Sequence, residues 1–419
     1  MALTVAAAAS SCGNKEEAKE ENAKKPAAEN IQTENTQTEN AEGGEGETQP
    51  AEGEAEKPAE QPTSGKAVVH LACAGDNLIH DNIYEEAKQP DGSYDFHKCY
   101  ENVRGLIEGT DVAILNQETV VNDAFEPSTF PVFSTPTEDG DAVVDLGFNV
   151  ISMSNNHVLD KGSAGLISSL DYWDSKGVVH YGAYRDEADS EDIKTLEVNG
   201  IKFAFLGYME HTNAIFLDDD EPGKVVYLSE EEKIERQIRQ ADEMADVVVV
   251  SCHYGTEILN EINDQQITLT PKLVEWGADL VIGTQAHALS TCTYMDKPDG
   301  GKAFVYYGLG NFFSTMYDAD NPDGQYGRSI IGILGKLDVV KDYDNGGAIS
   351  FEHVKAIPVI SHYEGASWDS MWYNCAVYPY GSYSEDLWSR HMMHVQAGVS
   401  RDDLERYINF IPHEFLAYE

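Results

Sequence analysis

The feature that most constrains this chain is a series of short apolar, β-branched runs, most of which end in polar side chains. Segments of helical composition separate many of these runs. Strands that alternate with helices predict an α/β fold with a largely parallel or mixed sheet. The runs cover residues 68–74, 112–115, 150–153, 203–207, 247–251, 280–282 and 304–307.

The helical segments are expected at residues 100–108, 164–175, 230–244 and 265–276, with a further helix at 400–410 near the end of the chain. The third of them is preceded by Ser229 and carries glutamates from Glu230 to Glu232. This spacing is typical of a capping box, so we expect that helix to begin there.

Six of the runs end in side chains that could bind a metal or transfer a proton. Because ligands bind beyond the carboxyl ends of the strands in α/β sheets, we expect these six ends to meet in one crevice. His211, just past the 203–207 run, and His80 are further residues placed to reach it. The candidates at the strand ends are Asp76, Asn77, Glu118, Asn155, Asn156, His157, Asp160, His253, Glu257, Gln285, His287 and Asn311.

Carboxylates, an amide oxygen and imidazoles together form a mixed oxygen and nitrogen ligand set, which suits Mn, Fe or Zn better than calcium. His157 could then give a proton to a leaving group, with Asp160 orienting its ring. Glu257 could be a further ligand or an orienting partner. The alternative is that each residue only caps a turn, as asparagine pairs at strand ends often do. The expected ligands are Asp76, Glu118, Asn156, His253 and His287.

The same segments, in order, resemble the conserved blocks of the capsule-synthesis CapA family, also called the poly-γ-glutamate capsule family. The resemblance covers residues 67–360 and implies a four-layer α/β sandwich of mixed sheets flanked by helices, similar to calcineurin-like metallophosphoesterases. It also places the expected ligands on the metal-binding positions of that superfamily and His157 on its catalytic histidine. The blocks are GDN at 75, LNQET at 115, GFNVISMSNNHVLDKG at 147, YGA at 181, VVVVSCHYGTE at 247, GADLVIGTQAH at 277 and YYGLGNFF at 306.

The resemblance implies a role in making, exporting or anchoring an anionic surface polymer. One reading is a metal-dependent hydrolase or transferase outside the membrane; the other is a non-catalytic component that binds the polymer and works with its membrane synthase. Two positions depart from the pattern. Leu78 stands where the phosphoesterase motif has a histidine, and Gln285 replaces the first histidine of the family's His-Pro-His. Both departures remove an imidazole, so they argue against a two-metal site and leave a one-metal or a metal-free site as the alternatives.

The two ends of the chain differ in composition from this domain. Residues 1–12 resemble the end of a bacterial lipoprotein signal and predict a lipid anchor at Cys12 on the extracellular side of the cell membrane. Residues 13–66 are rich in Glu, Ala, Asn and Pro and predict a solvated acidic linker. Residues 361–419 are aromatic-rich at first and are expected to pack on the domain, although the aromatic side chains could also line a polymer groove.

The formal net charge of -46 argues against nucleic acid as a partner. A polyanion would also be repelled at long range, so its binding requires a bound cation or a local basic cluster. The basic residues nearest the motifs are Lys161, Arg185, Lys272 and Arg328.

Overall fold

A computed structural model describes residues 64–317 and 325–419. The predicted lipoprotein signal, with Cys12, and nearly all of the predicted linker lie outside these residues. No helix within the described ranges is long and apolar enough to cross a membrane.

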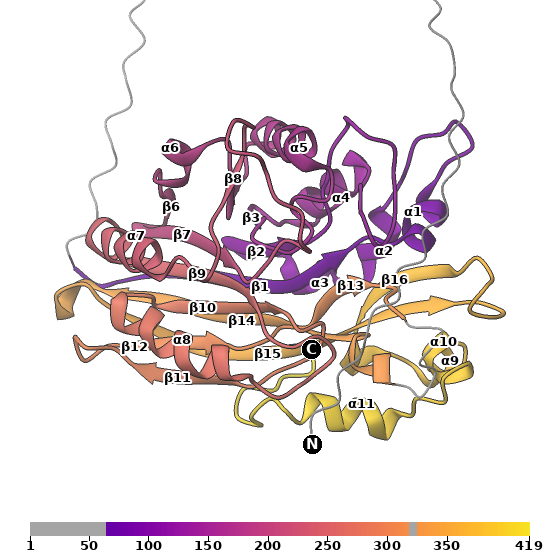
Figure 1. The fold of residues 1–419 in the computed structure, drawn as a ribbon. Helices are drawn as coiled ribbons and strands as arrows, with labels where there is room; N and C mark the ends of the chain where they lie inside the picture. Colours follow the sequence, from indigo (N-terminus) through magenta and orange to yellow (C-terminus); the bar gives the residue numbers. More distant parts are fainter. Residues whose placement is uncertain (1–63, 318–324) are drawn as a thin grey trace, which may run out of the picture. The chain divides into compact units, whose positions relative to one another are not determined.

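Two mixed β-sheets pack against each other, and helices cover their outer faces (Figure 1). In the larger sheet β1 runs parallel to β2 and antiparallel to β14, and β13 (Asn311–Ser314) pairs with the end of β1. Its strand order is β16 (Tyr373–Pro379), β15 (Ala348–Glu364), β14 (Ile331–Asp342), β1 (Lys66–Leu78), β2 (Val112–Gln117), β3 (Val150–Ser152) and β4 (Val179–Tyr181).

The smaller sheet has a parallel centre, because β7, β9, β10 and β12 all run in the same direction. A separate ribbon joins β5 (Ala183–Tyr184) to β8 (Lys224–Val225). The strand order of the smaller sheet is β11 (Cys292–Asp296), β12 (Lys302–Tyr306), β10 (Leu280–Gln285), β9 (Val247–Tyr254), β7 (Ile201–Met209) and β6 (Lys194–Val198).

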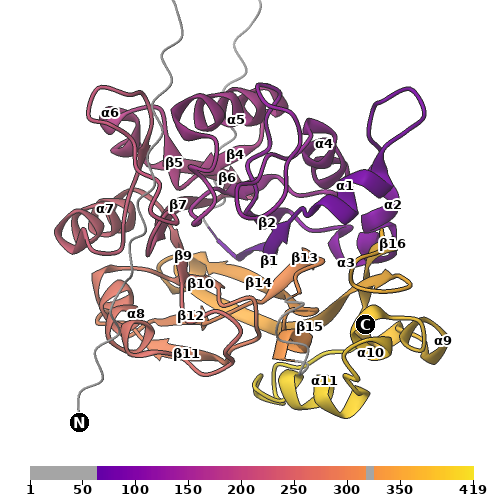
Figure 2. The same ribbon diagram turned by 45° about the vertical axis from the view of Figure 1, so that its right-hand side comes forward.

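The helices lie in two main groups (Figure 2). The larger sheet is covered by α1 (Asp81–Ala87), α2 (His97–Tyr100), α3 (Arg104–Ile107), α4 (Thr137–Leu146) and α5 (Gly162–Lys176). The smaller sheet is covered by α7 (Glu231–Met244) and α8 (Asp264–Trp276). The short α6 (Glu187–Ser190) precedes β6, and the chain ends with α9 (Glu385–Trp388), α10 (Met392–Val395) and α11 (Arg401–Ile408).

Alternation along the strands of the smaller sheet produces the layers. Phe203 and Phe205 of β7 belong to the core shared with the larger sheet, whereas Ala204 and Leu206 belong to the core shared with α7 and α8. Successive side chains of a strand point to opposite faces, so one strand serves both cores. The predicted four-layer α/β sandwich of mixed sheets flanked by helices is confirmed.

The predicted capping box at Ser229 is wrong. The N-cap of α7 is Glu230, whose side chain makes no cap hydrogen bond. Its Oε1 instead accepts from the Tyr227 N–H at 2.9 Å, within the turn that precedes the helix. Reciprocal boxes occur elsewhere, at Asn263 before α8 and at Ser400 before α11.

Two other expected segments have different bounds in the structure. Residues 100–108 cover the last residue of α2, a 3-10 turn (Glu101–Val103) and α3 rather than one continuous helix. The boundary predicted after residue 360 falls inside β15, and β16 extends the larger sheet beyond it. Trp372, Leu404 and Ile408 of the C-terminal segment are buried in the same core as β1.

Candidate metal centre

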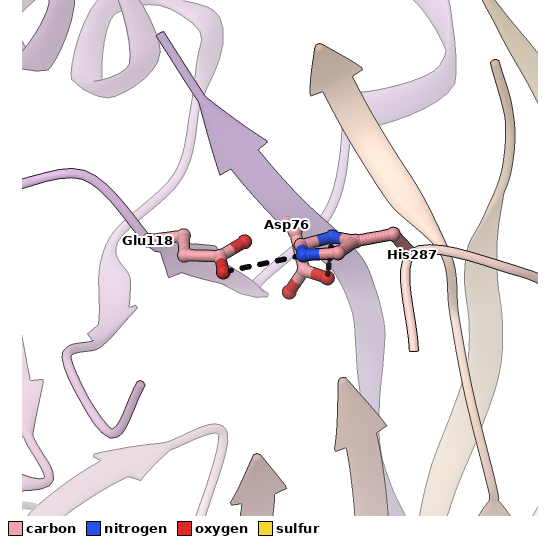
Figure 3. A group of neighbouring side chains, drawn as sticks. All are labelled: Asp76, Glu118 and His287. Atoms are coloured by element: carbon pink, nitrogen blue, oxygen red, sulfur yellow. Dashed lines mark ion pairs between the residues drawn. The ribbon is translucent and has the colours of Figure 1, made fainter. Parts of the chain in front are cut away.

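Three buried side chains from separate strand ends form the centre of the site. Asp76 lies near the end of β1, Glu118 follows β2 and His287 follows β10. One ligand atom from each lies within 4.8 Å of the others, and all three residues are buried. Figure 3 shows Glu118 and His287 approaching each other beside Asp76. Three of the strand ends that were predicted to meet therefore do so in the structure, and they come from both sheets.

His253 and Asn156 border this group. The Nε2 atom of His253 lies 3.4 Å from Glu118 Oε1 and 3.0 Å from Asn156 Oδ1. The Nε2 atom of His287 lies 3.6 Å from the same Glu118 oxygen. All five expected ligands are thus contiguous, and both imidazoles present Nε2 to one carboxylate oxygen.

The opposite nitrogen of each imidazole is held by a polar partner. His253 Nδ1 lies 2.8 Å from the Thr284 hydroxyl, and His287 Nδ1 lies 2.8 Å from Asn311 Oδ1. Because the Asn311 amide nitrogen donates to the Ser329 carbonyl at 2.9 Å, the Asn311 oxygen faces His287 and accepts its Nδ1–H. In its neutral form, an imidazole that donates from Nδ1 in this way has its Nε2 available to a metal.

The electrostatics of the site centre on Glu118. Burial, together with the Asp76 carboxylate, raises the pKa of Glu118 to about 8. Burial alone would lower the pKa of His287, but Glu118 and Asp76 raise it to about 10. Burial lowers the pKa of His253 to about 4, although Asp76 opposes this shift.

Neither carboxylate oxygen of Glu118 has a hydrogen-bond partner among the described residues. A buried carboxylate without a partner is costly, and a cation beside it removes that cost. The neighbouring imidazole, carboxylate and amide groups are ligands that a divalent transition metal accepts. The residues present therefore fit a divalent metal ion.

His157 and Asp160 lie beside this group, after β3. His157 Nδ1 lies 2.8 Å from Asp160 Oδ2, which also accepts from the Phe133 N–H at 2.6 Å. The Phe133 ring meets the His157 ring edge-on, with their centroids 4.7 Å apart. The Asn213 amide nitrogen lies 3.3 Å from His157 Nδ1, and its Oδ1 accepts from the Asn156 amide at 3.4 Å. Asn213 therefore connects the histidine with an expected ligand. The His157 ring is thus held on several sides.

The remaining pocket candidates occupy different places. Asn155 donates to the Gln117 carbonyl at 2.9 Å and accepts from the His157 N–H at 3.2 Å, so it shapes the turn. The Gln285 N–H donates to Asp76 at 3.3 Å, and its amide group donates to the exposed Glu257 at 3.3 Å.

Two candidates do not contact the ligand group. The Asn77 amide donates to Gln117 Oε1 at 2.9 Å and to Asp139 at 3.1 Å, within a separate buried polar network. His211 is exposed, and its Nδ1 accepts from the Asn213 N–H at 3.3 Å.

Sequence reasoning missed Thr284, Asn213 and Phe133. Thr284 immediately precedes the predicted motif and could have been suspected from its place in the strand. Asn213 and Phe133 lie in loops, and no local pattern signals their contacts. His80, which was only weakly indicated, packs edge-on against Phe133 with centroids 5.3 Å apart, and burial lowers its pKa to about 3.

The four basic residues expected near the site are engaged elsewhere. Each pairs with an acidic residue or an amide or carbonyl oxygen, so none of them provides a cluster for a polyanion at the ligand group. The contacts are Lys161 with the Val132 carbonyl, Arg185 with Asp171 and Asp174, Lys272 with Glu231, and Arg328 with Asn260.

Comparison with known proteins gives a family match. The family described as "Bacterial capsule synthesis protein PGA_cap" matches residues 70–316. The capsule biosynthesis protein CapA of Bacillus anthracis is 28% identical over 43% of this chain and 43% of its own length. The PGA biosynthesis protein CapA of Bacillus subtilis (strain 168) is 29% identical over 42% of this chain and 46% of its own length. The aligned part therefore spans less than half the length of these relatives.

Solved structures with detectable likeness are more distant. The Haemophilus influenzae NAD nucleotidase has 12% identity and a TM-score of 0.42, with 84% of this chain and 58% of that chain covered. A phosphatase from Mycoplasma pneumoniae has 15% identity and a TM-score of 0.43, with 70% of this chain and 94% of that chain covered.

Proposed function

The chain belongs to the family of bacterial capsule synthesis proteins described as PGA_cap, and from this premise we propose that it acts in the biosynthesis of an anionic capsule polymer at the cell envelope. Poly-γ-glutamate or a related polymer is the substrate class that its CapA relatives suggest. Within that role we assign it a metal-dependent hydrolase or transferase activity outside the membrane. The matched residues 70–316 contain all five expected ligands.

The observation that carries the assignment is Glu118, a buried carboxylate with no hydrogen-bond partner among the described residues. It lies between the Nε2 atoms of His253 and His287, at 3.4 and 3.6 Å. Glu118, His253, His287, Asn156 and Asp76 would hold a Mn, Fe or Zn ion there. Such an ion, when bound, supplies Lewis-acid polarisation of a phosphoryl or acyl group.

His157 is the residue placed to move a proton. Asp160 accepts its Nδ1–H, which leaves Nε2 for exchange with a leaving group. Asp160 has little freedom to move, because the same oxygen is fixed by the Phe133 N–H. The pair therefore supports general acid catalysis in which Asp160 orients the ring and His157 transfers the proton.

A non-catalytic polymer-binding or export component is the second candidate. Gln285 favours it, because an amide stands where the family usually carries an imidazole, and imidazole is the better ligand for Zn and Fe. The predicted lipid anchor at Cys12 and a partnership with the membrane synthase would serve either function.

Metal analysis of the purified protein tests the assignment. We expect one divalent ion per chain, lost in His253→Ala and His287→Ala but kept in His413→Ala, which changes an exposed histidine. His157→Ala should keep the ion and lose hydrolysis of a generic phosphodiester or of poly-γ-glutamate. No metal under any loading, together with retained polymer binding, would reject the hydrolase and support the second candidate.

A further inference from the structure

The end of β1, which carries Asp76, is irregularly paired on both sides. Towards β2 the register shifts between Ala74 and Asp76, and towards β13 it shifts between Asp76 and Asn77. A shift of this kind interrupts the ladder of backbone hydrogen bonds and can redirect a side chain. The ladder alone therefore does not fix the direction of Asp76, and a further support for this strand end is expected.

A buried polar network joins the residues next to the two carboxylate ligands. Asn77 follows Asp76, and Gln117 precedes Glu118. The Asn77 amide donates to Gln117 Oε1 at 2.9 Å, and both amides donate to Asp139 Oδ2 of α4, at 3.1 and 3.4 Å. The Glu118 N–H in turn donates to the Asn77 carbonyl at 3.2 Å. The ends of β1 and β2 are thus tied to each other and to α4.

Tyr100 of α2 completes this network. Its hydroxyl lies 2.6 Å from Asp139 Oδ1 and 3.1 Å from Asn77 Oδ1. Its ring stacks on Phe312 of β13 with centroids 6.0 Å apart, and it meets Phe313 edge-on at 5.6 Å. The hydroxyl therefore belongs to the polar network, while the ring belongs to the apolar core.

The contacts around Tyr100 require one more proton than an ionised Asp139 provides. A hydroxyl has a single hydrogen, but the Tyr100 oxygen faces two acceptor oxygens, Asp139 Oδ1 and Asn77 Oδ1. A carboxyl protonated at Oδ1 would donate to Tyr100 and leave the Tyr100 hydrogen for Asn77. An ionised carboxylate would take that hydrogen and leave the Asn77 oxygen without a side-chain donor in the described part of the chain.

The surroundings of Asp139 also favour the neutral form. Its side-chain hydrogen-bond partners, Tyr100, Asn77 and Gln117, are all uncharged. Burial of a carboxylate without a cation disfavours the charged form. Burial raises the pKa of Asp139 to about 7, although the hydrogen bonds from these three partners oppose the shift. The neutral carboxyl is therefore accessible near neutral pH, in agreement with the number of hydrogens.

We propose that Tyr100 and a neutral Asp139 are positioning residues, which hold the ends of β1 and β2 so that Asp76 and Glu118 face one metal ion. The ion rests on the proposed function, whereas the support of the strand ends rests on the hydrogen bonds alone. Both residues act through the amide side chains between them and the ligands, not by contact with the ion.

Tyr100→Phe tests the network with little change in packing, because the ring keeps its contacts with Phe312 and Phe313. In the metal-free protein, hydrogen exchange followed by mass spectrometry should show about tenfold faster exchange of the Glu118 amide, whose acceptor is the Asn77 carbonyl. Competition for Zn²⁺ with a chromophoric chelator should show about tenfold weaker binding.

Tyr208→Phe is the matched control. Tyr208 is also fully buried, but its hydroxyl donates to Gln237 Oε1 at 3.2 Å in the core between the smaller sheet and α7. Removal of this hydroxyl should leave both the exchange of the Glu118 amide and the zinc affinity within about twofold. Equal changes in Tyr100→Phe and Tyr208→Phe would overturn the proposal, because the loss of any buried hydroxyl would then explain them.

Asp139→Asn tests the proton on the carboxyl. The new amide can donate to the Tyr100 oxygen and accept from Asn77, as the neutral carboxyl does, so exchange and zinc affinity should stay within about twofold of the unmodified protein. Asp139→Ala should instead resemble Tyr100→Phe. Equal losses in Asp139→Asn and Asp139→Ala would overturn the neutral carboxyl.

The exchange measurement separates this inference from the proposed function. A protein that takes up no zinc would refute the metal centre, while the exchange of the Glu118 amide in the metal-free variants would still decide whether the network holds the strand ends. Exchange at the unmodified rate in Tyr100→Phe would overturn the inference even in a protein that binds metal.

Discussion

Asn311 gives the sharpest test of how the metal centre is held. Its side chain is buried, accepts from His287 Nδ1 at 2.8 Å and donates to the Ser329 carbonyl at 2.9 Å. Asn311→Ala removes both hydrogen bonds and leaves the buried Ser329 carbonyl without this donor, which should cost about 1–3 kcal/mol of unfolding free energy. His287 Nδ1 then keeps only Asp76 Oδ2, at 3.2 Å, and loss of one orienting partner typically weakens metal affinity by about 10–100-fold. Competition with a chromophoric chelator measures that affinity, and urea unfolding of the metal-free protein measures stability.

A matched control separates the two effects. Asn260 is also buried; its amide donates to the Leu289 carbonyl at 2.7 Å and accepts from Arg328 at 2.9 Å, but it contacts no expected ligand. Asn260→Ala should therefore cost a similar unfolding free energy and leave metal affinity within about twofold. Equal metal affinity in Asn311→Ala and Asn260→Ala would refute the claim that Asn311 orients His287.

Three further predictions test the fold and the site. Gly75→Ala should destabilise the protein by at least about 3 kcal/mol in urea unfolding, because the Cβ atom of the new alanine would lie 1.8 Å from the Gly310 carbonyl oxygen. The control Gly105→Ala, which has open space around the added Cβ atom, should be neutral or stabilising by up to about 1 kcal/mol. Burial lowers the pKa of His391 to about 3, so this ring stays neutral in the folded state, whereas in the unfolded state it takes up a proton below pH 6.5. Its contribution to the unfolding free energy should fall by about 2 kcal/mol between pH 7 and 5, and His391→Gln should reduce the fall measured for the protein by that amount. Gln285→His should leave the metal content at one ion per chain by elemental analysis, because Leu78 still provides no imidazole and Asp76 Oδ2 faces His287 Nδ1; two ions per chain would show that Gln285 alone limits the site.

The positions of the strand ends could be predicted from the sequence because two simple rules determine them. Apolar β-branched runs form buried strands, and parallel strands bring their carboxyl ends to one edge of a sheet. β1, β2 and β3 run parallel in one sheet, and β7, β9 and β10 do so in the other. This rule places Asp76 and Glu118 together at one edge of the larger sheet, and His287 joins them from the smaller sheet because the two sheets pack against each other.

Side-chain direction was harder to predict. Asp76 and Asn77 are neighbours at the end of β1, and a register shift falls between them, yet only Asp76 reaches the ligand group. The sequence shows both as polar residues after a strand and does not say which face each occupies. Asn213 was missed for a different reason: it reaches His157 from 56 residues away with a φ of 51°, a loop conformation that no local pattern specifies.

The hydrogen bonds of the two central carboxylates bear on the number of metal ions. Asp76 Oδ1 accepts from the Asn116 amide at 2.7 Å, and its Oδ2 lies 3.2 Å from His287 Nδ1. Glu118 has no such donors in the described part of the chain. A carboxylate behind the Nδ1 of an imidazole orients that ring towards a metal, whereas a carboxylate without donors needs the metal itself.

The site is therefore centred on Glu118, with Asp76 better placed to support His287 than to bridge two ions. The two sequence departures fit this arrangement. Leu78 is buried at the end of β1, and the Gln285 amide donates a hydrogen bond to Glu257. A second ion would therefore find no imidazole at either position. If one ion is bound, the nucleophile and the leaving group cannot be activated by separate metals. Proton transfer by His157 then becomes a larger part of any hydrolysis, so His157→Ala should remove more activity than it would in a two-metal enzyme.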